Sequence, residues 1–229
     1  MPKHIGIVGC SAEGASLCYR TICQEGATLM GGHAHPEVSL HTPSLADYVT
    51  CLAAGDREGI AALMLDSAAR LAAAGADFLI CPDNTIHQAF DLVAPCSPLP
   101  WLHIAEVVAD AAIAAGHHRL GLLGTAWLVE SDVYPEALSK RALELVRPSA
   151  SERDEIDRII MEELVMGQFT PEAEAFHLQV IAHMAGAGAD AVILGCTEIP
   201  LIIGDHNAPL PVLDSTRLLA RAALRHALS

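Results

Sequence analysis

Cys196 is the residue with the clearest capacity for chemistry. It follows the apolar run Ala191–Leu194 and Gly195, and Thr197 and Glu198 come next. Such a run is typical of a buried strand in a parallel sheet, and these strands end at the edge where open α/β folds bind ligands. We expect a helix to begin at Thr197, and a thiol at a helix N-terminus has a lowered pKa that makes the reactive thiolate accessible. A buried structural cysteine is the alternative interpretation.

Asp83 occupies the equivalent place in an earlier segment of the chain. Residues 75–83 align with residues 188–196 at a constant offset of 113 (188 − 75 and 196 − 83), which places Asp83 where the later segment has Cys196. A carboxylate there could be a base that faces Cys196 across a cleft. It could also be the N-cap of the helix that follows, since Asp is a favoured capping residue.

A second repeat supports the first. The stretch 120–125 resembles the opening stretch 5–10 at an offset of 115 (120 − 5), so two strand motifs recur in the same order. Repeats of this kind indicate equivalent structural units. We therefore predict an α/β fold of two pseudosymmetric lobes, each a short, mainly parallel sheet flanked by helices, with the active site in the cleft between them. The predicted N-terminal lobe comprises residues 1–100 plus 215–229, and the C-terminal lobe residues 101–214.

Hydrophobic periodicity predicts the elements that position these turns. Strands are expected at 4–8, 38–41, 78–81, 101–102, 120–124, 143–146, 191–194 and 212–213. Helices are expected at 12–23, 57–74, 84–92, 104–115, 133–140, 151–166 (with Ser151 as N-cap), 171–185 and 216–228. The stretch 26–36, with three glycines and a proline, is expected to be a loop.

Polar residues at the predicted strand ends could hold a substrate. Backbone amides at helix starts bind carboxylates without a lysine, and hydroxyl groups add further donors. The candidate substrate-binding residues are Ser11, Asn84, Thr85, Thr125, Thr197 and Glu198. Taken one at a time, Ser and Thr in turns are usually caps. His87 could orient a neighbouring side chain, or it could be an ordinary helical histidine.

Composition excludes several classes of protein. A formal net charge of −15 argues against nucleic acid or an anionic membrane as the main partner. The chain has no apolar run of the length of a membrane span and no signal-peptide pattern. Seven cysteines without a CxxC pair do not predict a disulfide framework, which favours a cytoplasmic protein. The histidines lack the spacing of a metal site, and the Gly6-x-x-Gly9 opening lacks the full dinucleotide-binding pattern.

The chain resembles the aspartate/glutamate racemase family of cofactor-independent racemases over essentially its whole length. The segment Leu194-Gly-Cys-Thr-Glu-Ile-Pro200 is similar to the family's second cysteine motif. Pro82-Asp-Asn-Thr-Ile-His87 is similar to its first motif, in which a cysteine precedes Asn-Thr-x-His. The resemblance implies two pseudosymmetric α/β domains, a small carboxylate substrate such as an amino acid, a homodimer, and no cofactor or metal.

In those racemases two cysteines flank the α-carbon, and one removes a proton while the other delivers one to the opposite face. The resemblance implies that Cys196 is one of the pair and that Asp83 takes the place of the other. A carboxylate is a weaker base than a thiolate, with an unperturbed pKa of ~3.9 against ~8.5, although desolvation raises it. We therefore expect a PLP-independent amino-acid racemase or epimerase that uses Asp83 and Cys196 on opposite faces.

Two other interpretations stay open. The chain lacks several side chains that are common in the family. It has Leu128 in place of a hydroxyl residue, Met166 in place of a lysine, and no arginine in the loop Leu40–Asp47, which leaves room for a less acidic substrate. A decarboxylase or cis-trans isomerase of the same superfamily, similar to arylmalonate decarboxylase or maleate isomerase, would need only one cysteine. A non-catalytic protein that binds a ligand on the same scaffold is the third possibility.

Overall fold

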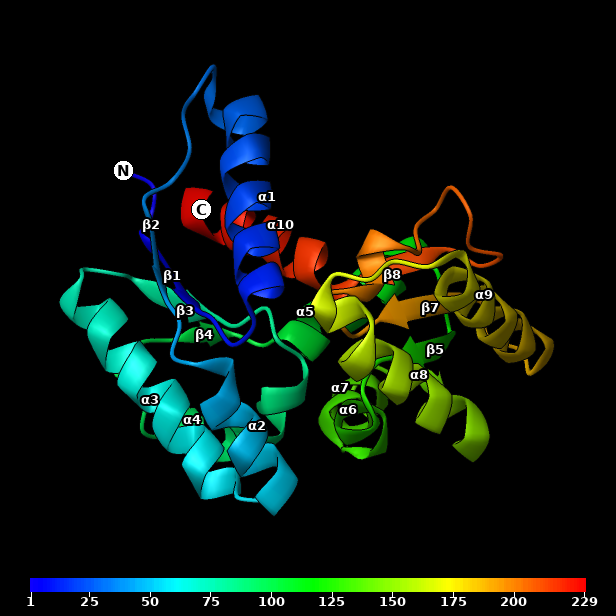
Figure 1. The fold of residues 1–229 in the computed structure, drawn as a ribbon. Coiled ribbons are helices and arrows are strands. Elements are labelled where there is room, and N and C mark those ends of the chain that lie inside the picture. The colour runs from blue at the N-terminus through cyan, green and yellow to red at the C-terminus, as the bar shows by residue number, and fades with distance from the viewer. The chain divides into compact units, whose positions relative to one another are not determined.

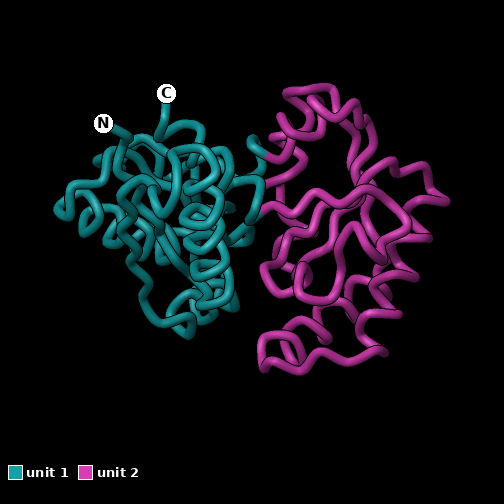
Figure 2. Tube along the Cα trace, turned by 90° about the horizontal axis from the view of Figure 1, so that it is seen from above, with its two compact units in different colours: residues 1–107, 216–229 teal, residues 108–215 magenta.

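The chain is described by a computed structural model that covers residues 1–229 (Figure 1). It divides into two compact units, one of residues 1–107 and 216–229 and the other of residues 108–215 (Figure 2). We call them unit 1 and unit 2. Each contains a four-stranded sheet in which every strand pair is parallel, flanked by helices. The predicted two-lobe α/β architecture is confirmed.

The sheet of unit 1 has the strand order β2-β1-β3-β4. Its strands are β1 (Ile5–Val8), β2 (Val38–His41), β3 (Phe78–Ile80) and β4 (Trp101–Leu102). Its helical elements are α1 (Ala12–Met30), α2 (Leu45–Ala54), α3 (Arg57–Ala73), the 3₁₀ turn η1 (Thr85–Ala89), α4 (Phe90–Val93), the start of α5 (Ile104–Ala115) and nearly all of α10 (Ser215–Leu228).

Alternation along the strands of unit 1 decides which helices cover which face. Ile5 and Ile7 of β1 pack with Cys18 and Ile22 of α1 and with the apolar side of α10. Val8, the next residue of β1, packs with residues of α3 instead. Figure 1 shows α1 and α10 on one side of this sheet and α2 and α3 on the other. Both faces of the central strands β1 and β3 are therefore buried, which explains why these two strands have nearly continuous apolar sequences.

The sheet of unit 2 repeats this topology, with the order β6-β5-β7-β8. Its strands are β5 (Arg119–Leu123), β6 (Glu144–Val146), β7 (Ala191–Leu194) and β8 (Val212–Asp214). Its helical elements are the larger part of α5, α6 (Ala126–Glu130), α7 (Val133–Ser139), α8 (Ala150–Glu162), η2 (Leu164–Met166), α9 (Pro171–Gly186) and η3 (Ile199–Leu201). The ends of β5 and β7, Leu123 and Leu194, pack with apolar residues of α8 and α9.

The same turn precedes the second central strand in each unit. Asp77 donates its backbone N–H to the His4 carbonyl at 2.8 Å, and Asp190 donates to the Arg119 carbonyl at 2.8 Å. The two carboxylates accept the backbone N–H groups of His4 and Arg119 in return. The glycine two residues before each aspartate has a positive φ, +90° and +95° respectively, a conformation that a side chain would strain. The two copies of the sequence repeat therefore form equivalent hydrogen bonds, one set in each unit.

Some element boundaries differ from the predictions. Helix α1 continues beyond Cys23 to Met30, so the loop predicted over residues 26–36 is wrong for residues 26–30. Gly26 lies inside the helix, where a Cβ would come within 2.8 Å of His35, so this glycine permits close packing rather than ending the helix. Helix α8 is capped by Ser149, not by Ser151. The Ser149 hydroxyl accepts the Glu152 N–H, and the Glu152 carboxylate accepts the Ser149 N–H at 2.8 Å, which is a capping box.

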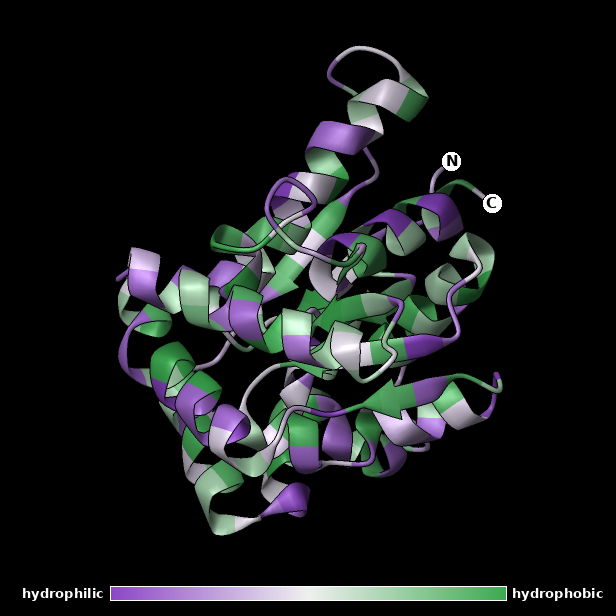
Figure 3. Cartoon of the chain, turned by 90° about the vertical axis from the view of Figure 1, so that its right-hand side faces the viewer, coloured by the Kyte–Doolittle hydropathy of each residue, from purple (hydrophilic) through white to green (hydrophobic).

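Three helical segments also depart from expectation. Helices α2 and α6 form where no helix was predicted, and the predicted helix over residues 84–92 is the 3₁₀ turn η1 followed by the single turn α4. Figure 3 shows the strands as mainly apolar and the helices as mixed, with polar positions interspersed along them. None of these helices is long and apolar enough to cross a membrane.

Candidate active site

Cys196 lies in a tight turn after β7, beside a buried carboxylate. Its Sγ donates a hydrogen bond to Glu198 Oε2 at 2.9 Å, and the Thr197 hydroxyl donates to the same oxygen at 2.8 Å. Glu198 is 4% exposed. The predicted helix after Cys196 is wrong, because only the three-residue turn η3 follows, and it starts at Ile199. The thiol therefore does not lie at the N-terminus of an α-helix, and the Glu198 carboxylate that accepts its hydrogen bond could take its proton.

Two glycines at the strand ends shape the turn that carries Cys196. A Cβ on Gly195 would lie 2.5 Å from Leu128 Cδ2 and 2.8 Å from the Leu123 carbonyl oxygen, and a Cβ on Gly124 would lie 2.8 Å from Leu128 Cδ2. Leu128, which is buried, thus packs over the ends of β5 and β7. The Gly195 N–H donates to the Leu123 carbonyl at 2.7 Å, so the sheet ladder continues up to Cys196.

Asp83 lies in the equivalent turn after β3, where its carboxylate and its backbone carbonyl each accept a hydrogen bond. Its Oδ1 accepts the Ile86 N–H at 3.2 Å, so the carboxylate does cap η1. Its backbone carbonyl accepts Nδ1–H of His87 at 2.7 Å. Capping uses one carboxylate oxygen, and the other takes no part in that bond. A capping role and a role as a base are therefore compatible in this geometry.

Cys81 is not an alternative to Asp83, the predicted acid/base residue of unit 1. It is fully buried, and its Sγ donates to the Asp83 carbonyl at 3.7 Å. Burial, and after it the charge of Asp83, raises the pKa of the Cys81 thiol well above its ordinary value. Burial also raises the pKa of Tyr48, whose hydroxyl packs in the same region. Cys81 is thus a neutral thiol of the core.

The other predicted site residues lie at the carboxyl ends of adjacent strands. In unit 1, Ser11 follows β1, and Asn84 and Thr85 follow β3, which pairs with β1. The Ser11 hydroxyl accepts the Gly14 N–H at 3.1 Å and caps α1. Asn84 and Thr85 are buried. Unit 1 therefore brings Ser11, Asn84 and Thr85 to the same sheet edge as Asp83.

Unit 2 does the same with Thr125 and Thr197. Thr125 follows β5, which pairs with β7, so both threonines lie at the edge that carries Cys196. Thr125 differs from Ser11 in one respect, since its side chain makes no capping bond to α6. Asp157 of α8 instead accepts the Ala126 N–H at 2.7 Å, at the start of α6. The offset of 113 also pairs Thr85 with Glu198 (198 − 85), so the carboxylates stand at different positions in the two turns.

Sequence reasoning missed two polar residues at this edge of unit 2. Asp214 ends β8 and pairs with Leu194 of β7, two residues before Cys196. Ser215 follows, and its hydroxyl donates to the Leu194 carbonyl at 2.8 Å. The signal was present, because a polar pair follows the apolar Val212–Leu213 just as Thr197 and Glu198 follow the run before Cys196.

Comparison with solved structures agrees with this architecture. A putative Asp/Glu racemase from Yersinia pestis is 32% identical and superposes with a TM-score of 0.91, covering 99% of this chain and all of that one. An aspartate racemase homologue from Pyrococcus horikoshii OT3 is 28% identical with a TM-score of 0.85, over 99% of this chain and all of that one.

Sequence comparison leads to the same group of proteins. The broad specificity amino-acid racemase RacX of Bacillus subtilis (strain 168) is 22% identical over 171 residues, which is 74% of this chain and 73% of that protein. The family model described as Asp/Glu/Hydantoin racemase matches residues 5–223. That match spans both units and nearly the whole chain, so the protein belongs to the Asp/Glu/hydantoin racemase family.

Proposed function

We propose that the protein is a cofactor-independent amino-acid racemase or epimerase in which Cys196 and Asp83 act on opposite faces of the substrate α-carbon. The observation that carries the proposal is the hydrogen bond from the Cys196 thiol to the buried Glu198 carboxylate, 2.9 Å long. It gives the thiol proton an acceptor at a strand end, in the turn that is equivalent to the turn of Asp83. Family membership supports the reaction class.

The reaction needs two proton-carrying groups, one on each face of the α-carbon, because a bound substrate cannot flip its orientation in the site. In one direction Glu198 takes the thiol proton, the Cys196 thiolate removes the α-proton, and the protonated Asp83 delivers its own proton to the other face. The C–H bond that breaks leaves its electron pair on the substrate as an enediolate, and the new C–H bond uses that pair. The state left behind has a Cys196 thiol, a protonated Glu198 and an ionised Asp83, and it is the starting state for the opposite direction. There Asp83 removes the α-proton, the Cys196 thiol delivers its proton to the other face, and Glu198 returns its proton to the thiolate.

The remaining residues are proposed to hold the substrate carboxylate. Hydroxyl or amide side chains lie at the carboxyl ends of the strands in both sheets, on Ser11, Asn84, Thr85, Thr125 and Thr197. Glu198 was expected among the binding residues, but its two short hydrogen bonds favour the role of proton acceptor for Cys196. The substrate class proposed is an α-amino acid, in keeping with the name of the Bacillus subtilis relative.

The test is exchange of the α-proton with solvent. L- and D-amino acids with acidic, neutral and basic side chains are incubated with the protein in heavy water, and loss of the α-proton signal and change in optical rotation are followed. We expect exchange with at least one amino acid, and we expect its racemisation, followed by optical rotation, to be lost in Cys196→Ala and in Asp83→Asn. No exchange across the panel, or full activity in Cys196→Ala, would contradict the proposal.

The buried Leu128 beside the Cys196 turn favours a second candidate. An apolar neighbour at that place suits a substrate with an apolar substituent, such as an arylmalonate that loses carbon dioxide and is reprotonated by a single cysteine. Carbon dioxide release from a substituted malonate, with activity that survives Asp83→Asn, would support this decarboxylase over the racemase.

A further inference from the structure

We propose that His87 is a positioning residue for Asp83, holding the turn after β3 so that the carboxylate meets the substrate in one orientation. The inference rests on the proposed function, since it assigns a second residue to the Asp83 side of the same site. His87 is not proposed to touch the substrate.

The hydrogen bond of His87 defines its tautomer. Its Nδ1 lies 2.7 Å from the Asp83 backbone carbonyl, which can only accept, so Nδ1 carries the hydrogen and donates it. Nε2 then carries the lone pair, and it is buried without a hydrogen-bond partner. The imidazole is thus fixed by a single strong contact, and that contact is to the residue proposed as the base.

The surroundings keep this imidazole neutral. His87 is 3% exposed, its ring stacks on Phe90 at 5.6 Å and it meets His103 edge to face at 4.7 Å. Burial, and after it the proximity of His103, lowers the pKa of His87 well below its ordinary value. A neutral imidazole adds no positive charge beside the carboxylate, so its contribution is geometric.

The contact matters because it holds the backbone of the residue that is proposed as the base. The same carbonyl accepts the Cys81 thiol at 3.7 Å, which is a weaker bond. The carboxylate is held on one side by the Ile86 N–H at 3.2 Å. Loss of the His87 donor would remove the 2.7 Å hydrogen bond to the Asp83 peptide, and any shift of that peptide would move the carboxylate with it. A misplacement of about 1 Å can cost about a hundredfold in rate when a reacting group must be aligned.

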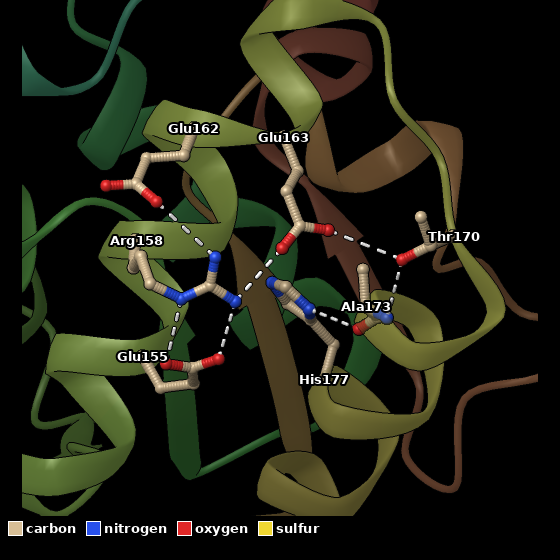
Figure 4. Close-up of polar contacts among 7 residues, drawn as sticks. All are labelled: Glu155, Arg158, Glu162, Glu163, Thr170, Ala173 and His177. Atoms are coloured by element: carbon tan, nitrogen blue, oxygen red, sulfur yellow. Dashed lines mark hydrogen bonds and ion pairs between the residues drawn. The ribbon is translucent and has the colours of Figure 1, made fainter.

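His177 in unit 2 is a matched control. It is fully buried, its Nδ1 donates to the backbone carbonyl four residues earlier, Ala173, at 2.8 Å, and its Nε2 has no hydrogen-bond partner. His87 donates to the carbonyl four residues earlier in the same way. Figure 4 shows His177 beside Glu163, whose carboxylate is held by Arg158 and by the Thr170 hydroxyl. None of these groups belongs to the proposed site.

The experiment compares His87→Leu with His177→Leu, and each with the corresponding Asn variant. Leucine removes the donor while keeping an apolar volume, whereas asparagine can place an amide N–H where Nδ1–H was. We expect His87→Leu to lower kcat for α-proton exchange about ten- to hundredfold with little change in KM, and His87→Asn to recover most of that loss. His177→Leu should lower the unfolding midpoint to a similar degree and leave kcat per folded molecule unchanged.

The direction of exchange gives a second readout that loss of stability would not move. Asp83 removes the proton of only one enantiomer, so His87→Leu should slow exchange of that enantiomer more than exchange of the other. Equal slowing of both enantiomers, or equal kcat in the His87 and His177 variants, would overturn the positioning role. If Asp83→Asn and Cys196→Ala are inactive while His87→Leu is fully active, only this inference fails. If those two variants are active, the proposed function fails with it.

Discussion

Substitution of Gly195 by alanine tests whether the turn that carries Cys196 is as tightly built as the structure indicates. The new Cβ would lie 2.8 Å from the Leu123 carbonyl oxygen, against ordinary contacts of 3.4 Å or more. To restore an ordinary contact (3.4 − 2.8 Å), the backbone of the turn at residue 195 must move by about 0.6 Å. The carbonyl cannot easily move away, because it accepts the Gly195 N–H at 2.7 Å within the ladder between β5 and β7.

The expected effect has two parts. Overpacking of this kind costs about 1–3 kcal/mol of stability. The shift also carries Cys196 with it, and a displacement of this size should lower the rate of α-proton exchange about ten- to hundredfold, given the steep dependence of rate on alignment. The loss in activity should therefore exceed what the fraction of unfolded protein explains.

Gly124→Ala is the matched comparison. Its Cβ would meet the same Leu128 side chain, at 2.8 Å, but its contacts with Gly195 backbone atoms are ordinary at 3.6 Å. Because a leucine side chain can rotate and a ladder carbonyl cannot, Gly124→Ala should lose less activity and less stability. Urea unfolding and exchange in heavy water measure the two quantities. Equal behaviour of the two variants, or a Gly195→Ala protein with unchanged exchange, would refute the reasoning.

Three further predictions follow from single contacts. Glu198→Gln retains an oxygen to accept from Cys196 and Thr197 but loses the charge, so exchange in heavy water should fall by about 10²–10⁴, the usual contribution of a general base; a change below tenfold would remove Glu198 from the mechanism. Ser149→Ala breaks the capping box of α8 and should cost about 1 kcal/mol in urea unfolding, with exchange unaffected. Burial lowers the pKa of both His87 and His177. Histidine in an unfolded chain has a pKa of ~6.5, so below that pH the unfolded state binds more protons than the folded state. The free energy of unfolding therefore falls as the pH decreases, by up to about 1.4 kcal/mol per pH unit for each histidine. Unfolding at pH 7 and pH 5.5 measures this slope, which a protein with leucine at both positions should lack in part.

Much of the fold could be read from the chain because the relevant signals are local. A parallel strand buried on both faces needs a run of apolar residues, and the turn into the next strand needs a glycine with positive φ followed by a capping aspartate. The segments around Asp83 and Cys196 carry these signals twice, so the repeat predicted two α/β units. The prediction of two α/β units, which the structure confirms, rests on that repetition.

Other features depend on neighbours that no local pattern specifies. Gly26 reads as a helix breaker, but its place against His35 keeps it inside α1. Asp157 caps α6 from a different helix, 31 positions away in the chain. Such contacts are decided when elements pack, because a short polar side chain takes whichever partner the packing brings within hydrogen-bond distance.

The sequence by itself determined that a thiol and a carboxylate stand in equivalent turns at strand ends, since residue type and register are local properties. Only the tertiary structure decided what each group touches. The Cys196 thiol contacts Glu198 in the turn that precedes η3, and Asp83 accepts hydrogen bonds from Ile86 and His87 of η1. The physical reason is that hydrogen bonds need distances within about 0.5 Å of ideal, and such distances are set by packing rather than by sequence spacing.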